Sequence, residues 1–352
     1  MNIRTTISPD FTVIAGPCSA ESARQVMECA EKLSAMGVGI LRAGVWKPRT
    51  RPGGFEGAGA PALEWLCQAR EKTGMKLAVE VAGASHVEAA LKAGIDILWI
   101  GARTSASPFA VEEIAQALKG NDIPVMVKNP INPDVNLWTG AIERIERAGI
   151  SRISAIHRGF SDIQESVLRY APQWEIPIEL RRRMPSLPIF CDPSHMAGRR
   201  ELVGTLAQMA LDMNADGLFV EVHPDPEHAL SDSRQQLTPD GFRAMVSSLE
   251  WRREIHDADV RNLAPSRNEL DRLDAQLVEL LARRMKIVQE IGEYKHLNNL
   301  AVLQSKRYQN VSDSVAKLAS EKGISEKFVR SIFETIHAES IRCQLENNKT
   351  QS

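Results

Sequence analysis

One thiol, one imidazole and two carboxylates stand at or just after the ends of short apolar runs in the sequence. They belong to Cys18, His195, Glu221 and Asp232. Sulfur, nitrogen and oxygen ligands together suit a borderline divalent ion such as Mn²⁺, Fe²⁺, Co²⁺ or Zn²⁺. No short motif joins these residues, so they form a metal site only if the fold brings their loops together. Taken singly, Cys18 could be a buried thiol and His195 a histidine hydrogen-bonded within a loop.

Six cationic side chains occupy similar places, at or just after other apolar runs. They are Arg42, Lys47, Arg49, Arg103, Lys128 and Arg158. Like charges that gather at one site repel one another unless anions neutralise them. The natural ligand would therefore carry several negative charges, with phosphate and carboxylate groups as the candidates. Any single cation could instead serve a structural ion pair, but that interpretation explains the six together poorly.

The elements that must position these residues alternate regularly up to about residue 255. Eight apolar runs rich in Val, Ile and Leu are separated by amphipathic segments, and they end at Ala15, Gly44, Val81, Gly101, Val127, Ile156, Cys191 and Val222. Continuous apolar strands indicate burial on both faces, as in a parallel sheet. Eight strand–helix repeats favour an α/β fold of the (β/α)8 TIM-barrel type, in which the loops after the strands converge on one mouth. The loops after strands 1, 7 and 8 would then be neighbours, which favours the metal site.

The pattern changes beyond Trp251. The polar stretch 256–265 is expected to be a linker whose Pro-Ser end marks a helix N-cap. After it the sequence contains only helical patterns, over 267–297, 305–322 and 325–346. We therefore predict a barrel domain over 1–255 and a small all-helical domain over 266–352. A helical domain of roughly 90 residues is small enough to need a partner surface for its stability.

Composition excludes several classes of function. The net charge of −2 gives no reason to expect nucleic acid or an anionic membrane as a partner. No run approaches the roughly 18 apolar residues of a membrane span, and the start of the chain lacks the apolar core of a signal peptide. The five cysteines have no disulfide or zinc-finger spacing. We expect a cytoplasmic protein with reduced thiols, in which Cys29, Cys67 and Cys343 are ordinary core or surface thiols.

Five motifs in the first 255 residues carry a family resemblance: "GPCSAE", "LRAGVWKPRT", "IGARTS", "DPSHMAGRRELV" and "VEVHPDPEHALSD". Together they resemble the 3-deoxy-D-arabino-heptulosonate 7-phosphate (DAHP) synthases, and within these the type I-beta branch. The resemblance implies condensation of phosphoenolpyruvate with erythrose 4-phosphate and one divalent metal ion per barrel. We expect Mn²⁺, with Fe²⁺, Co²⁺ and Zn²⁺ as alternatives. That branch often carries an N-terminal regulatory domain, which we expect to be absent here.

The resemblance also implies a role for each candidate residue. The metal ligands would be the four residues named first, and the phosphoenolpyruvate site would contain Arg42, Lys47, Arg103, Lys128 and Arg158. Arg49 and Thr50 would contact erythrose 4-phosphate, while Lys47 and Glu80 are candidates for moving protons near the new bond. The motif "KPRT" favours this activity over that of the related 3-deoxy-octulosonate 8-phosphate synthases, which use arabinose 5-phosphate and remain the alternative. Gly53 and Gly54 would let the backbone approach a phosphate closely.

The first helix expected in the tail has an informative face. At about 100° per residue, Leu270, Leu277, Leu281 and Val288 share one apolar stripe. Three cations, Arg267, Arg284 and Lys295, lie along its edge. Periodicity alone allows two interpretations: cations that border a packed face, or a row of cations that lines a pocket between helices.

The segment "SRNELDRLDAQLVELLARRMKIVQEIGEYK", together with Arg307 and "ESIRCQ", resembles the all-helical AroQ-type chorismate mutases. The resemblance implies rearrangement of chorismate to prephenate, catalysed by Arg284, Lys295 and Gln344, of which Lys295 and Gln344 would donate to the ether oxygen. The substrate-binding set would be Arg267, Arg284, Lys295, Gln304, Arg307, Ser340 and Gln344. The first helices of two chains would intertwine in a homodimer, so that Arg267 serves the other chain's site. Gln304 and Tyr308 stand where these mutases often have acidic residues. We therefore expect mutase activity with an altered affinity for chorismate.

The two implied activities sit at the entry and the first branch of aromatic amino-acid biosynthesis, the shikimate pathway. We therefore expect a bifunctional transferase and isomerase in which prephenate or chorismate regulates the barrel through the helical domain. Such coupling between two sites must be reciprocal. The alternative for the tail is a non-catalytic module for dimerisation and ligand sensing.

Overall fold

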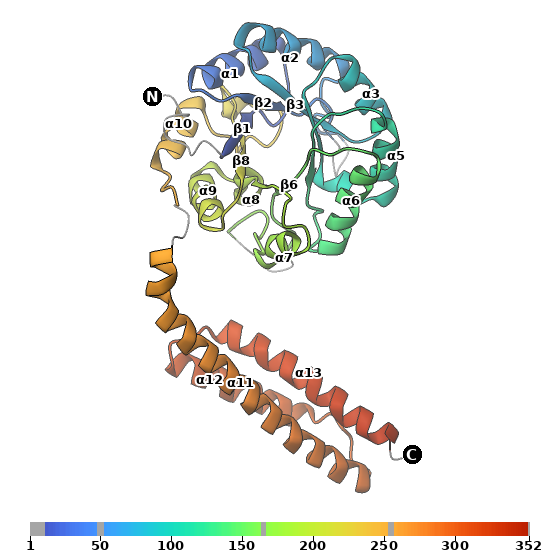
Figure 1. Cartoon of the computed structure of the whole chain (residues 1–352), viewed down its shortest axis with the longest axis vertical. Helices are drawn as coiled ribbons and strands as arrows, with labels where there is room; N and C mark the ends of the chain where they lie inside the picture. Colours follow the sequence, from blue (N-terminus) through green and yellow to red (C-terminus); the bar gives the residue numbers. More distant parts are fainter. Residues whose placement is uncertain (1–10, 48–52, 163–166, 253–256, 351–352) are drawn as a thin grey trace. The chain divides into compact units, whose positions relative to one another are not determined.

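The computed structural model describes residues 11–47, 53–162, 167–252 and 257–350, with side chains to residue 346. Arg49 and Thr50 lie outside the described residues. The chain divides into two compact units, Met1–Arg253 and Glu254–Ser352. The first unit is a closed barrel of eight parallel strands, which confirms the predicted (β/α)8 fold (Figure 1). The described residues contain no helix that is long and apolar enough to cross a membrane.

The strands follow the eight predicted apolar runs closely. Their bounds are β1 Thr12–Gly16, β2 Ile40–Ala43, β3 Lys76–Val81, β4 Ile97–Ile100, β5 Val125–Lys128, β6 Ile153–His157, β7 Ile189–Cys191 and β8 Gly217–Glu221. Each strand pairs with the next in the sequence, and β1 pairs with β8 from Thr12 opposite Gly217 to Gly16 opposite Glu221. This last pairing closes the barrel and places the end of β1 beside the end of β8.

Helices form the outer ring around the strands (Figure 1). Their bounds are α1 Ala23–Ala35, α2 Ala60–Thr73, α3 Ala84–Lys92, α4 Ala102–Ser105, α5 Pro108–Leu118, α6 Val135–Arg147, α7 Glu175–Arg183, α8 Pro193–Ala197, α9 Val203–Asp212 and α10 Pro239–Ser248, with 3-10 turns at Arg200–Leu202 and Pro226–His228. Several of them begin at side-chain caps, as at Ser22, which accepts a hydrogen bond from the Gln25 N–H. The helices bury their apolar faces against the strands in one large core.

A second, smaller core fills the inside of the barrel. It consists of Ile14, Ala78, Ile97, Trp99, Met126, Ile156, Phe190 and Phe219. The rings of Trp99 and Phe219 meet edge to face with centroids 5.1 Å apart. The guanidinium of Arg42 lies 5.1 Å and 4.5 Å from these two centroids, within the range of a cation–π contact. The aromatic rings therefore hold Arg42 in place from inside the barrel.

Gly16 lets β1 and β2 approach closely at the point where the candidate site begins. Its φ of 153° lies in a region that other residues rarely adopt, and a Cβ there would lie 2.1 Å from the Arg42 carbonyl oxygen. The glycine is therefore required where the chain passes from β1 into the segment that contains Cys18.

The second unit is helical, as predicted. It consists of α11 Asp257–Leu297, α12 Ser305–Glu321 and α13 Glu326–Thr350. The structure differs from the prediction at residues 256–265, which were expected to be a linker. The chain is helical from Asp257, and Pro265 lies inside α11. Asp257 and Asp259 in the first turn favour a helix N-terminus there. Proline removes one backbone hydrogen bond and disfavours the helix locally, but the long helix continues through it.

The apolar stripe of α11 is only partly covered within one chain. Val288 is 7% exposed, but Leu270 and Leu277 are each 58% exposed and Leu281 is 38% exposed. The packed face that the periodicity suggests is therefore not formed by the helices of a single chain over this stretch.

Candidate active sites

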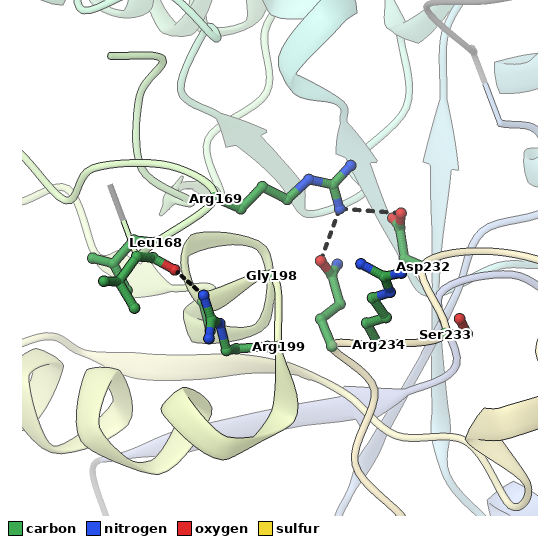
Figure 2. Close-up of a pocket in the computed structure, with 10 residues that line it drawn as sticks. Leu168, Arg169, Gly198, Arg199, Asp232, Ser233 and Arg234 are labelled. Carbon is green, nitrogen blue, oxygen red and sulfur yellow. Dashed lines mark hydrogen bonds and ion pairs between the residues drawn. The ribbon is translucent and has the colours of Figure 1, made fainter. Parts of the chain in front are cut away.

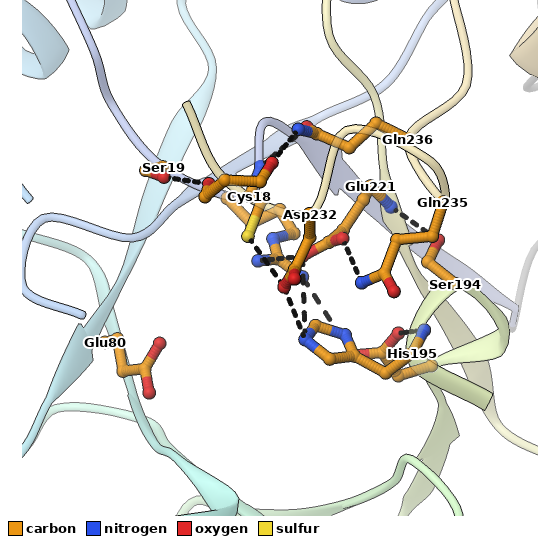
Figure 3. Close-up of polar contacts among 12 residues, drawn as sticks. Cys18, Ser19, Glu80, Ser194, His195, Glu221, Asp232, Gln235 and Gln236 are labelled. Atoms are coloured by element: carbon orange, nitrogen blue, oxygen red, sulfur yellow. Dashed lines mark hydrogen bonds and ion pairs between the residues drawn. The ribbon is translucent and has the colours of Figure 1, made fainter. Parts of the chain in front are cut away.

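The four predicted metal ligands meet at the mouth of the barrel (Figure 3). One ligand atom each from Cys18, Glu221 and Asp232 lies within 4.8 Å of the others. The Cys18 Sγ is 3.4 Å from Asp232 Oδ2. The Nε2 of His195 lies 3.8 Å from Glu221 Oε1 and 3.9 Å from Asp232 Oδ2. These donors are close enough together to bind one divalent cation, so the donor set fits the predicted ion.

Backbone and amide contacts hold the cluster in position. The Cys18 N–H donates to Gln236 Oε1 at 2.9 Å, which ties the loop after β1 to the loop after β8. Glu221, the last residue of β8, accepts a hydrogen bond at Oε2 from Gln235 Nε2 at 2.7 Å. Asp232 has a φ of 45°, the left-handed region that Asp tolerates better than most residues. The two loops therefore fix the thiol and both carboxylates.

Asp192 organises the site, although no role was predicted for it. It caps α8, where its Oδ1 accepts from the His195 N–H at 3.0 Å. Its Oδ2 lies 2.8 Å from His195 Nδ1 and accepts from Lys128 Nζ at 2.7 Å. A carboxylate on one ring nitrogen orients the other nitrogen toward a metal. The signal that could have found it is its place directly after strand β7, three residues before His195.

Charge within the cluster favours a bound cation. Burial raises the pKa of the Cys18 thiol, and the Glu221 carboxylate raises it further. The pKa of Glu221 is lowered: burial opposes ionisation, but the charges of His195 and Arg42 outweigh it. Burial also opposes the ionisation of Asp232, but the charges of His195 and Arg169 outweigh it and lower the pKa of this carboxyl. Two ionised carboxylates beside a thiol that needs a positive charge to lose its proton form a site suited to a divalent ion.

Four of the six predicted cations converge on the same mouth. A pocket there is lined by Lys47, Glu80, Ala102, Arg103, Lys128, Arg158, Arg169, His195 and Asp232. Lys47 Nζ lies 3.7 Å from Glu80 Oε2, so the two proposed proton-moving groups are adjacent. Although burial opposes its charge, Cys18, Glu80 and Glu221 hold the pKa of Lys47 above its usual range.

Arg42 and Arg158 each have at least one guanidinium nitrogen that is not hydrogen-bonded within the described part of the chain. Arg42 is fully buried and donates to Glu221 Oε1 at 3.1 Å. Its Nε and Nη1, and the Nη1 of Arg158, are buried with no hydrogen-bond partner in the described part of the chain. Buried guanidinium donors are costly to leave unpaired. An anionic ligand would satisfy them.

Arg169 is a further cation at this mouth that the sequence did not reveal. Its Nη1 donates to Asp232 Oδ1 at 3.1 Å and to Gln235 Oε1 at 2.8 Å. It also lines a second cavity of about 530 Å³, together with Arg199, Arg234 and Asp232 (Figure 2). The barrel pocket and this cavity share Arg169 and Asp232, so basic side chains continue from the four candidate ligands into the second cavity. The loop that contains Arg169 has no strand or helix pattern, so nothing in the sequence indicates where it lies.

The helical unit contains a separate pocket of about 290 Å³. Six of the seven predicted substrate-binding residues line it: Arg284, Lys295, Gln304, Arg307, Ser340 and Gln344. Arg284 Nη1 donates to Ser340 Oγ at 2.6 Å, and Lys295 Nζ donates to Gln344 Oε1 at 3.3 Å. The seventh residue, Arg267, is exposed on α11 and does not line this pocket. Of the two interpretations of the cationic row, the structure supports a pocket between helices.

Comparison with known proteins agrees with this arrangement. The family model described as the DAHP synthetase I family matches residues 3–256. The chain belongs to this family. A second model, chorismate mutase type II, matches residues 266–345. A DAHP synthase domain is therefore followed by a chorismate mutase domain, and together they support a bifunctional enzyme of the shikimate pathway acting on small molecules.

Individual relatives match the DAHP synthase domain. The phospho-2-dehydro-3-deoxyheptonate aldolase of Thermotoga maritima is 36% identical over 240 residues, which cover 68% of this chain and 69% of that protein. A 2-dehydro-3-deoxyphosphooctonate aldolase of Rhodopseudomonas palustris is 27% identical over 259 residues, 68% of this chain and 86% of that protein. The crystal structure of the Thermotoga maritima DAHP synthase has a TM-score of 0.61 at 36% identity and covers 67% of each chain.

Proposed function

We propose that the barrel condenses phosphoenolpyruvate with erythrose 4-phosphate to give DAHP and phosphate, and that it depends on one divalent metal, with Mn²⁺ expected. The observation that carries this proposal is the meeting of Cys18, His195, Glu221 and Asp232 with unpaired buried arginine donors at one barrel mouth. Thiolate, imidazole and carboxylate suit the ion, and the arginines suit the phosphate and carboxylate groups of the substrates.

Side chains of the barrel have distinct tasks in this reaction. Arg42, Lys128 and Arg158 hold phosphoenolpyruvate, and the positioning of two substrates in register can remove about 7–11 kcal/mol from a bimolecular barrier. Lys47 and Glu80 lie 3.7 Å apart and manage the protons at the new carbon–carbon bond. The four ligands would hold a divalent ion, which would supply Lewis acidity for the aldehyde carbonyl.

Two assays test the synthase proposal. Phosphoenolpyruvate consumption is followed with erythrose 4-phosphate and, in parallel, with arabinose 5-phosphate; faster turnover with the longer sugar would favour the octulosonate-type alternative. Cys18→Ser is then compared with Cys67→Ser, a thiol outside the cluster that packs against the helices. We expect Cys18→Ser to lose manganese-dependent turnover and Cys67→Ser to keep it. Full activity of Cys18→Ser would remove the metal assignment.

We propose that the helical pocket converts chorismate to prephenate. The substrate is a dicarboxylate, and the pocket presents Arg284 and Arg307 to it. The rearrangement is pericyclic and needs only shape and charge aimed at the ether oxygen. Lys295 and Gln344 lie in hydrogen-bond contact, and we expect both to donate to that oxygen.

Loss of chorismate absorbance tests this second activity. We expect Lys295→Ala to lose it and Lys317→Ala, an exposed lysine on α12, to keep it. An inactive wild-type chain that still binds chorismate would instead favour the non-catalytic, ligand-sensing alternative.

We also propose that prephenate or chorismate, bound at the helical pocket, regulates the barrel. The coupling must be reciprocal, so phosphoenolpyruvate and the metal would change the affinity of the helical unit for its ligand by the same factor. An unchanged synthase rate at saturating prephenate and chorismate would exclude this regulation.

A further inference from the structure

His337 lies in the helical pocket, and no role in binding or catalysis has so far been given to it. It stands on α13 three residues before Ser340 and seven before Gln344. This spacing places the three side chains on one face of the helix, and all three line the cavity. The imidazole therefore belongs to the same wall as two residues of the proposed mutase site.

The surroundings of the imidazole leave one nitrogen without a partner. Its Nε2 is buried and makes no hydrogen bond to any residue that the structure describes. The ring packs against that of Tyr308, with centroids 4.4 Å apart and planes inclined by 37°. Tyr308 thus fixes the position of the ring. A buried polar atom left unsatisfied is destabilising, so a ligand that forms a hydrogen bond with Nε2 would recover that free energy.

The charges around the ring determine its protonation state. Arg284 and Lys295 of α11, Arg307 of α12 and Glu334 of α13 line the same cavity. Burial lowers the pKa of His337, and the charges of Arg284 and Lys295 lower it further. At neutral pH the ring is therefore neutral and has one N–H. The oxygens of an anionic ligand are acceptors, so the useful role of that N–H is to donate.

We propose that His337 is a substrate-contacting residue of the helical pocket, which donates a hydrogen bond to an oxygen of the bound dicarboxylate while Tyr308 supports its ring. This inference rests on the proposed mutase function and adds a polar contact to the cationic and amide groups already assigned. The contact is made alike in the ground state and the transition state, because the oxygen it binds does not change its bonding during the rearrangement.

Steady-state kinetics of three variants test the proposal. His337→Phe keeps a ring against Tyr308 and removes the donor, whereas His337→Gln restores a neutral donor. His296→Phe, on an exposed part of α11 outside the pocket, is the matched control. We expect His337→Phe to raise the KM for chorismate about tenfold, as for a hydrogen bond to a charged group, with kcat within about twofold. His337→Gln should recover most of this loss, and the control should match the wild type.

A binding measurement on the wild-type chain supplies a second readout that does not depend on any variant's stability. The histidine side-chain nitrogens are followed by NMR, and we expect the Nε2 signal of His337 to shift when prephenate is added. A KM for His337→Phe equal to the wild-type value, a His337→Gln variant no better than His337→Phe, or an unshifted Nε2 signal would each overturn the proposal. The proposed function would survive those results if Lys295→Ala still abolished turnover, whereas a wild-type chain without turnover would remove both.

Discussion

Asp192 links the two chemical sets of residues at the barrel mouth. It contacts Lys128 at 2.7 Å and His195 at 2.8 Å, and it lies 4.0 Å from Arg42. Although burial opposes its charge, His195 and Lys128 hold the pKa of Asp192 well below its usual range. One carboxylate thus balances cations of the proposed substrate site and orients a proposed metal ligand.

Asp192→Asn tests this double role. The substitution leaves buried cations without their counter-charge, which costs about 3–5 kcal/mol where a buried pair is broken. It also weakens the orientation of His195, a change that typically lowers metal affinity about 10–100-fold. Urea unfolding and manganese titration measure the two effects. Asp122→Asn, an exposed surface carboxylate, should change the free energy of unfolding by less than about 0.5 kcal/mol; equal effects in both variants would contradict this account.

The sequence located some of these residues but not others, and the reason is physical. Cys18, Arg42, Lys128 and Glu221 lie in or next to apolar strands, so the barrel pattern alone brings them to one end. Arg169 lies in a loop without periodicity, and its contact with Asp232 depends on tertiary structure. Arg267 was expected to serve another chain's site, and that expectation stays a prediction.

At the scale of elements, the repeat of apolar runs determined the barrel, because strands buried on both faces leave a continuous apolar signal. The start of α11 was harder to predict. A Pro-Ser pair ordinarily marks a helix N-terminus, yet the helix begins at Asp257 and runs through Pro265. The helix-favouring residues on both sides of Pro265 outweigh its effect. A rule that considers only the Pro-Ser pair does not take those residues into account.

Strand β6 carries a histidine with a strong pH response. Burial lowers the pKa of His157 to about 3 from an ordinary value of 6.5, and its Nε2 donates to the Pro172 carbonyl at 2.7 Å. Between these two pH values the unfolded chain binds one more proton than the folded chain. The free energy of unfolding should therefore fall as the pH drops below 6.5, by up to about 1.4 kcal/mol per pH unit from this group.

Urea unfolding of the wild type and of His157→Gln at pH 7, 6 and 5 measures this contribution. We expect the wild type to lose stability relative to the variant as the pH falls, because glutamine does not titrate. His228→Gln, at an exposed histidine, should retain the wild-type pH dependence. Parallel curves for the wild type and His157→Gln would show that His157 does not carry the effect.

At the scale of the whole molecule, one chain contains two separate units with separate pockets. The exposed apolar stripe of α11 supports the proposal that the helical unit completes itself with a second chain, since a small domain of this kind lacks enough buried surface alone. In such a homodimer Arg267 of one chain would enter the pocket of the other.

Complementation between chains tests this arrangement. Arg267→Ala and Lys295→Ala chains should each have little mutase activity, because each homodimer lacks one residue in both sites. When the two are co-expressed, a mixed dimer has one site with both residues intact and should recover part of the wild-type activity. Recovery should be absent when Lys295→Ala is paired with Gln344→Ala if Lys295 and Gln344 act in the same chain's site. No recovery in the first pair would contradict the shared site.

The most direct test of the account measures both activities on one sample before and after a chelator removes divalent ions. The barrel reaction is proposed to need a divalent ion, whereas every proposed substrate contact in the helical pocket is a group of the protein itself. We predict that chelation abolishes synthase turnover, that added manganese restores it, and that mutase turnover is unchanged throughout. Synthase activity that survives complete removal of metal, or mutase activity lost with it, would contradict the account.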